Sequence, residues 1–366
     1  MFFAFVFLCL VVFLFFNGEG KGTPVLLYHQ VNPLINVTPT IFEEHLEYIA
    51  SKYKTFTYTE AYEYVALYGK LPERSLLITF DDGYYDNYKE VFSLLKKYNI
   101  KATFFINTLF ISKEERLETA PYEVSEEANK KALLHFYTSN NGVSSQYVTA
   151  QEIQEMHASG LCDFQAHTHT HAPVFVSNKL TDFRSAKHND SSPIHLYKGE
   201  VLNGYPDFRS RGNCTFPGYA LDIEKAKKFA KEWESKWKHL PKKEALAQGQ
   251  TYADENKLLA PFSDAEAKER VRREINTNKE IIESITQTPV RFFAWTWGHH
   301  SDWGRAILAQ EGIVGFVTCK KGGIGLKPNW NNLKRVELRD PSLKKLKQVL
   351  WINTNSFTSW IYAFLS

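Results

Sequence analysis

The chain has 366 residues, of which 43% are hydrophobic and 15% aromatic, so it can bury a substantial core and form one large or two ordinary domains. Its formal net charge is only +3, whereas binding to nucleic acid phosphates needs a concentrated basic surface, and we therefore expect no nucleic acid partner. The four cysteines include no close pair, which argues against a disulfide framework and against a cysteine-bound zinc.

An unbroken apolar segment covers residues 2–16 and ends at the polar, glycine-rich residues 17–22. Its length is typical of a signal-peptide core and falls short of the about 20 residues that a membrane span needs. Because no basic residues precede it and no small-x-small cleavage site follows it, an uncleaved anchor and a buried apolar segment are the alternatives. We predict that residues 1–22 are a signal peptide or N-terminal membrane anchor. The protein is then exported to the periplasm or cell surface, and an anchor would associate it with the membrane.

Short apolar strands alternate with amphipathic helices in the first part of the remaining chain. We expect strands at 25–28, 76–80 and 102–106, and helices at 41–51, 60–68 and 86–98. This alternation predicts parallel strands joined by helical crossovers.

The same alternation returns later in the chain. A capping box at Thr149 predicts a helix that ends at Gly160, directly before a strand at 163–166, and a second capping box at Ser263 predicts a long helix to about residue 285. The remaining expected elements are a strand at 289–294, a helix at 303–310, and strands at 313–318 and 334–338.

Six or seven such units predict an α/β fold of the distorted (β/α) barrel type, with the active site at the carboxyl ends of the strands. We assign residues 23–340 to this catalytic domain. Between about 174 and 261 the alternation stops, and we interpret these residues as an insertion near the active-site face rather than as an independent domain. Residues 341–366 are predicted to be an apolar C-terminal tail.

Two adjacent carboxylates, Asp81 and Asp82, follow the apolar strand at 76–80 and precede Gly83. Adjacent side chains diverge at the end of a strand, so one carboxylate can bind a metal while the other faces a substrate water. The alternative is plain turn chemistry, since Asp and Gly both favour tight turns.

Three histidines follow the strand at 163–166. His167 and His171 are four residues apart and can reach one ion on a helical turn or tight loop, whereas we expect His169 to point elsewhere. Two imidazoles and one carboxylate favour Zn²⁺ or another divalent transition metal, with an open position for water. The alternative is that these are satisfied polar residues of a loop.

These segments resemble the polysaccharide deacetylases, the NodB-homology group also called carbohydrate esterase family 4. The resemblance rests on the Thr-Phe-Asp-Asp-Gly sequence at 79–83, the His-Thr-x-x-His sequence at 167–171, and the Tyr-His pair at 28–29. The resemblance covers about residues 24–110, 148–175 and 262–340. Within the family, the chain is similar in these segments to the exported branch that N-deacetylates poly-β-1,6-N-acetylglucosamine. It implies a barrel of the NodB-homology type with a large insertion.

The resemblance also implies roles for single residues. Asp82, His167 and His171 would hold the metal, Asp81 would be the general base, and His29 the general acid; without the resemblance, His29 would be read as a buried strand histidine. One departure is Thr296, which stands where the family usually has proline.

We expect three further residues to contact the substrate. Trp297 offers a face for a sugar ring, with ordinary core packing as the alternative. Tyr84 follows the Asp-Asp-Gly turn. Arg211 lies among arginines and aromatic residues of the insertion, a composition that suits a glycan with anionic groups or, alternatively, a packed surface loop.

The expected function is metal-dependent removal of N-acetyl groups from an amino-sugar polysaccharide of the cell envelope or an exopolysaccharide. Two alternatives stay open: a non-catalytic carbohydrate-binding or export protein on the same fold, and a deacylase of a different amide, such as an N-formyl or lipid-linked sugar. The metal centre acts on the carbonyl group alone, so the sequence does not separate these substrates.

Overall fold

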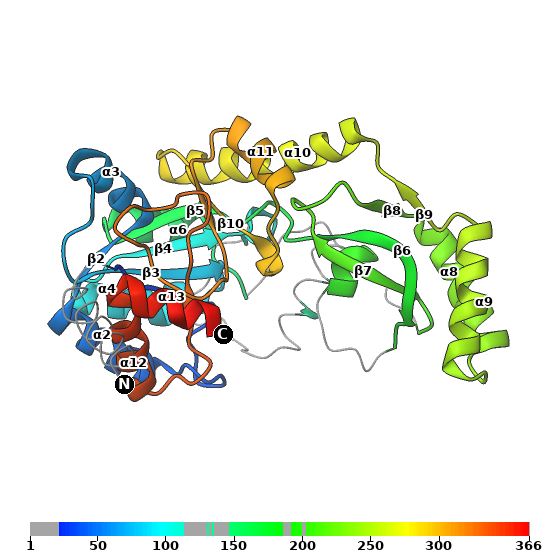
Figure 1. Ribbon diagram of the computed structural model, residues 1–366, viewed down its shortest axis with the longest axis horizontal. Coiled ribbons are helices and arrows are strands. Elements are labelled where there is room, and N and C mark those ends of the chain that lie inside the picture. The colour runs from blue at the N-terminus through cyan, green and yellow to red at the C-terminus, as the bar shows by residue number, and fades with distance from the viewer. Residues whose placement is uncertain are drawn as a thin grey trace, which may run out of the picture.

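The computed structural model describes residues 22–112, 130–131, 134, 146–185, 192–199 and 203–365. Within them, the larger of two sheets has eight strands, and its path runs β11, β10, β5, β4, β3, β1, β12, with β2 beside β3 (Figure 1). Every pairing is parallel. The strands are β1 (Val25–Tyr28), β2 (Lys54–Phe56), β3 (Ser75–Asp82), β4 (Ala102–Ile106), β5 (Cys162–Ala166), β10 (Phe292–Ala294), β11 (Gly315–Val317) and β12 (Val336–Glu337).

Helices connect these strands and cover the sheet. They are α2 (Pro39–Lys52), α3 (Tyr58–Tyr68), the π-helical segment η1 (Asn87–Phe92) with α4 (Ser93–Tyr98), α6 (Ala150–Ala158), α10 (Asp264–Thr286), α11 (Asp302–Gln310), α12 (Leu343–Thr354) and α13 (Ser356–Leu365), together with the 3₁₀ turns η2 (Thr108–Phe110) and η4 (Thr296–Gly298). Both predicted capping boxes are present, at Thr149 and at Ser263. The predicted α/β class and distorted barrel are confirmed. The barrel is open, because the path of the sheet ends at β11 and at β12 and these two strands do not pair in the described residues.

A ladder of stacked aromatic rings fixes the register of four neighbouring strands. Tyr28 stacks on Phe80 at 5.5 Å between ring centroids, Phe80 on Phe104 at 5.0 Å, and Phe104 on Phe164 at 5.3 Å. Each pair is also a register pair of the sheet. Cross-strand aromatic pairs stabilise a sheet, and a one-residue slip would separate all of them. The ladder therefore brings the carboxyl ends of β1, β3 and β5 to the same edge.

The two faces of the large sheet have different surroundings. Along β3, Ile78 and Phe80 belong to the main core under the helices, whereas Leu77 belongs to a second core inside the barrel. Since side chains alternate along a strand, Asp81 lies on the inner face with Leu77. The period of two therefore carries one of the two carboxylates into the barrel interior.

The predicted insertion forms a lobe with its own antiparallel sheet, which projects from the barrel in Figure 1. Its core contains aromatic residues such as Phe183, Phe229 and Trp237. The loss of the βα alternation thus reflects an antiparallel sheet with register shifts and a separate core, not irregular chain. The elements are β6 (Pro173–Phe183), α7 (Ser192–Leu196), β7 (Pro206–Gly212), β8 (Tyr219–Leu221), α8 (Ile223–Glu232), η3 (Trp233–Trp237), α9 (Lys242–Glu255) and β9 (Leu259–Pro261).

The C-terminal part differs from the predicted separate tail, because it forms α12 and α13. Leu346, Val349 and Leu350 of α12 are buried in the main core of the barrel. The backbone N–H of Gly22 donates to the carbonyl oxygen of Thr354 at 2.7 Å. Apolar spacing at i, i+3 and i+4 explains this packing, so α12 belongs to the barrel domain.

The predicted export segment lies outside the described residues, apart from Gly22. Of the helices that are described, none combines the length and the apolar character that crossing a membrane requires.

Candidate active site

The two carboxylates of the site lie where β3 ends. Asp81 and Asp82 pair in register with Phe105 and Ile106 of β4. Asp82 and Gly83 both have φ of +77°, in the left-handed region that Asp tolerates and Gly favours. This tight turn separates the directions of the two carboxylates.

The histidine loop, residues 167–171, follows β5 and is held by α10. The Nδ2 amide of Asn278 donates to the carbonyl oxygen of Thr168 at 2.6 Å, and the carboxylate of Glu274 accepts hydrogen bonds from the N–H and hydroxyl of Thr170 at 2.9 and 2.7 Å. Thr168 and His171 have φ of +70° and +56°. Since such backbone is strained for non-glycine residues, these bonds from α10 hold the loop in shape.

Asp82, His167 and His171 form a group whose ligand atoms all lie within 4.8 Å of one another, a group that could hold a metal ion. The Nε2 atoms of His167 and His171 are 3.4 and 3.5 Å from Oδ1 of Asp82. His169 is not in this group, and its Nδ1 lies 2.9 Å from the hydroxyl of Thr108.

The protonation of this group fits a transition metal. Nδ1 of His167 lies 2.8 Å from the carbonyl oxygen of Ala294, which can only accept, so Nδ1 carries a proton and Nε2 is the ring nitrogen that faces Asp82. Burial lowers the pKa of His171 to about 4, which keeps that ring neutral. Burial alone would raise the pKa of Asp82, but the imidazole groups of His167 and His171 beside it outweigh burial and hold the pKa below its ordinary value, so Asp82 is a carboxylate. Two imidazole lone pairs and one carboxylate are ligands that Zn²⁺ and similar ions accept.

Asp81 is paired with a residue that sequence reasoning missed. Arg335, directly before β12, donates from Nη1 to Oδ1 at 2.6 Å and from Nη2 to Oδ2 at 2.8 Å. Burial would raise the pKa of Asp81, but the charge of Arg335, followed by that of His167, outweighs it and holds the pKa below its ordinary value. Arg335 itself is 1% exposed. The predicted strand at 334–338 also contains Lys334 and Glu337, so nothing in the local sequence distinguishes Arg335 from a surface charge.

His29 lies at the end of β1 on another side of the site. Its Nδ1 is 3.6 Å from Oε1 of Glu337, and the two side chains are 40% and 55% exposed. Leu27 and Glu337 are register partners, so the pairing of β1 with β12 sets this contact. A cavity of about 370 Å³ is lined by both residues and by Arg339. His29 is therefore reachable by a bound molecule.

The three predicted substrate-binding residues lie at different places. Trp297 packs on His171 at 4.7 Å between ring centroids and donates from Nε1 to the His171 carbonyl oxygen at 3.0 Å. Burial and the negative charge of Asp82 raise the pKa of Tyr84. Arg211 is on the lobe strand β7, next to His299. Their substrate contacts stay predictions.

Thr296 lies at the junction of barrel and lobe. It is 2% exposed, and a Cβ atom added to Gly212 would lie 2.7 Å from its hydroxyl oxygen. The departure from proline therefore coincides with the close approach of β7 to η4.

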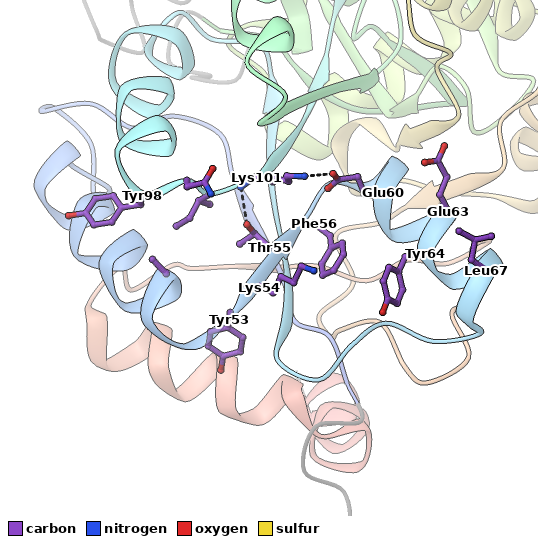
Figure 2. A pocket seen from close by; sticks show the side chains of 13 residues that line it. Tyr53, Lys54, Thr55, Phe56, Glu60, Glu63, Tyr64, Leu67, Tyr98 and Lys101 are labelled. Atoms are coloured by element: carbon purple, nitrogen blue, oxygen red, sulfur yellow. Dashed lines mark hydrogen bonds and ion pairs between the residues drawn. The ribbon is translucent and has the colours of Figure 1, made fainter.

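A larger cavity of about 640 Å³ opens at the amino end of β4, far along the strands from these residues (Figure 2). Figure 2 shows the paired side chains of Lys101 and Glu60 among the residues that line it. None of the predicted site residues lines it.

Comparison with known proteins gives a consistent assignment. The family profile described as polysaccharide deacetylase matches residues 68–192. YxkH of Bacillus subtilis, named for the polysaccharide deacetylases, is 34% identical over 207 residues, which are 54% of this chain and 66% of YxkH. A poly-β-1,6-N-acetyl-D-glucosamine N-deacetylase of Staphylococcus aureus is 27% identical over a segment that covers 39% of this chain and 41% of the length of that enzyme. The matched segments thus cover less than two thirds of both relatives.

A solved structure shows the same fold. The deacetylase domain of BpsB from Bordetella bronchiseptica superposes with a TM-score of 0.54 and 18% identity, over 87% of this chain and 97% of that domain. From the family match and the relatives, we conclude that this chain contains a polysaccharide deacetylase domain, matched at residues 68–192.

Proposed function

We propose that the protein is a metal-dependent hydrolase that removes N-acetyl groups from an amino-sugar polysaccharide of the cell envelope or an exopolysaccharide. The observation that carries the proposal is the cluster of Asp82, His167 and His171 beside an ionised Asp81. The relative named as an N-deacetylase of poly-β-1,6-N-acetyl-D-glucosamine supports this substrate class.

In this proposal Asp82, His167 and His171 hold Zn²⁺ or another divalent transition metal. Such an ion supplies Lewis acidity, which lowers the pKa of water and polarises a carbonyl group. The hydrogen bond from His167 to Ala294 orients that ring and fixes its tautomer, as is usual for histidine ligands of metals.

Asp81 is the general base. Its pairing with Arg335 keeps it ionised, and each carboxylate oxygen has a second lone pair that can accept a proton from water. The water oxygen bonds to the acetamide carbon, and the C–N bond then breaks to give acetate and an amine.

His29 is the general acid, because an amine leaves only with a proton. Its ring gives that proton to the leaving nitrogen, and the carboxylate of Glu337 stabilises the protonated ring before transfer. One water is consumed: Asp81 takes one of its protons and passes it to His29 or to solvent, and the other proton leaves with the acid product, which ionises to acetate.

We further propose that the protein acts outside the cytoplasm, with residues 1–22 as a signal peptide or anchor. The apolar residues 2–16 support this. Cell fractionation tests it: the protein should appear in the periplasm or at the cell surface, and a cytoplasmic location would refute it.

The direct test is acetate release from N-acetylated hexosamine oligomers by the metal-loaded protein. Chelation should abolish release and added metal should restore it. Asp81→Asn should abolish it while the metal stays bound. A substitution of an exposed acid, Glu255→Gln, is the matched control and should leave the rate unchanged. If no acetylated polymer releases acetate, the proposed reaction is wrong.

A further inference from the structure

Two arginines of the lobe lie on one face of β7, and neither pairs with a carboxylate that the structure describes. Arg209 and Arg211 alternate with residues of the lobe core such as Phe208, so they point away from that core. Neither forms an ion pair with any described acid, and Asp207 on the same face pairs with Arg184 at 2.9 Å. The two positive charges are therefore not neutralised by the part of the chain that the structure describes.

His299 faces these arginines from the barrel. The N–H of Gly212 points at Nδ1 of His299 at 3.1 Å, and since a backbone N–H only donates, Nδ1 must be the acceptor. A neutral ring then carries its proton on Nε2. That atom lies 2.7 Å from Nη1 of Arg211, which is also a donor.

The Nε2–H of His299 and the Nη1–H of Arg211 thus meet at one place, and both are hydrogen-bond donors. They need a third group that accepts a hydrogen bond from each. Burial, together with the charges of Arg211, Arg209 and His300, lowers the pKa of His299 to about 4, so the ring is neutral and this donor–donor contact persists at neutral pH. An oxygen of an anionic group would accept from both Nε2–H and Nη1–H. Charge-assisted hydrogen bonds of this kind are among the strong ones, and arginine is well suited to carboxylate and phosphate.

The location connects these residues with the candidate active site. Gly212 pairs with Pro173, two residues after His171, and Trp297, two residues before His299, donates to the His171 carbonyl. A sugar whose acetamide reaches the Asp82 cluster would therefore place a neighbouring sugar or substituent beside Arg211.

We propose that Arg209, Arg211 and His299 form a subsite for an anionic group of the glycan, a carboxylate or a phosphate, next to the sugar that is deacetylated. This inference rests on the proposed function for its activity readout. The preferred substrates are accordingly acidic N-acetylated glycans, and a neutral glycan binds the same metal cluster without this contact.

The test compares three N-acetylated oligosaccharides of equal length: neutral, carboxylated and phosphorylated. The parent protein should have a KM at least tenfold lower for an anionic oligosaccharide at low salt, and high salt should reduce this preference. Arg209→Gln and Arg211→Gln should each raise that KM about tenfold with kcat unchanged. In both variants the KM for the neutral oligosaccharide should rise much less than the KM for the anionic one.

The matched control is Lys228→Gln with Lys231→Gln, which removes two exposed positive charges from α8 of the same lobe. It should not change the preference. If Arg211→Gln fails to fold, the Arg209→Gln variant still tests the subsite, because Arg209 is exposed. Arg211→Lys keeps the positive charge but loses the two-pronged guanidinium group, and it should give an intermediate KM.

A second readout separates this proposal from the proposed function. Binding of the anionic oligosaccharides to the chelated protein, measured by calorimetry, should weaken about tenfold in the arginine variants. If the parent protein releases no acetate but the arginine variants still bind the anionic oligosaccharides more weakly, the proposed reaction is refuted and the proposed anion subsite is supported. If only the carboxylated or only the phosphorylated oligosaccharide binds more tightly than the neutral one, the result identifies the anionic group that the subsite takes. Equal affinity of the parent protein for neutral and anionic oligosaccharides would refute the subsite.

Discussion

The barrel and the lobe bury different kinds of side chains. The barrel holds ionisable groups in its interior, such as the pair of Asp81 and Arg335, and the buried Glu274 at the histidine loop. The core of the lobe consists of apolar and aromatic residues, among them Phe229 and Trp237, whose rings are 5.2 Å apart. Burying charge is costly unless it is paired, so the barrel keeps charges where chemistry needs them. The lobe buries Arg184, which pairs with Asp207 at 2.9 Å, and carries Arg209 on its exposed surface.

The largest effect should come from the cluster in the barrel. Asp82→Asn removes the anionic ligand, and we expect kcat/KM for acetate release to fall at least about a thousandfold, on the order of 4 kcal/mol. Bound metal, measured by elemental analysis, should fall below one per chain. Asp264→Asn, at the exposed start of α10, is the control and should have no effect. Activity within tenfold of the parent would show that the cluster is not the reaction centre.

The buried pair should have the next largest effect, on stability. Arg335→Met leaves Asp81 buried and unpaired, which should lower the free energy of unfolding by about 3 kcal/mol in urea denaturation. Adding Asp81→Asn should recover part of that loss, since the uncompensated charge is then gone. Lys268→Met, which breaks an exposed pair with Asp264, should give no measurable change. A double variant that loses the sum of both single effects would contradict this.

The lobe core offers the opposite kind of perturbation. Phe229→Ala should destabilise the lobe by about 3 kcal/mol, because it removes a fully buried ring. Hydrogen exchange should then be faster in β6 and α8 and unchanged in β3, and kcat on a short acetylated substrate should stay within about twofold. Leu67→Ala, at a side chain that is 77% exposed, is the control. Equal loss of protection in β3 would mean that barrel and lobe unfold as one unit.

The smallest expected effect is a pH dependence of barrel stability. Burial raises the pKa of Asp86 to about 7, above the ordinary value of 3.8. Between these values the unfolded chain loses the proton while the folded chain keeps it, so stability should fall as pH rises, by about 1 kcal/mol per pH unit. Asp86→Asn should flatten this slope between pH 4 and 7, even if it is less stable overall because its amide faces other donors. An unchanged slope would exclude Asp86 as the cause.

The sequence by itself determined the local elements and the residues that follow them. Capping boxes at Thr149 and Ser263 and the alternation of apolar residues predicted helices and strands near their observed bounds. Asp81, Asp82, His167 and His171 could be named because short sequence patterns place them directly after strands. Such signals depend on neighbouring residues, which is why they can be read along the chain.

Only the tertiary structure decided which groups meet across the chain. Arg335 lies 254 residues from Asp81, and Glu274 lies 104 residues from Thr170, so neither contact has a local signal. The antiparallel strands of the lobe also have no clear local signal, since β8 and β9 have only three residues each and the pairing of β6 with β7 is interrupted by register shifts. The pairing of β1 with β12 and the packing of α10 on the histidine loop set these distances. A contact that depends on strand pairing and helix packing exists only once the chain has folded.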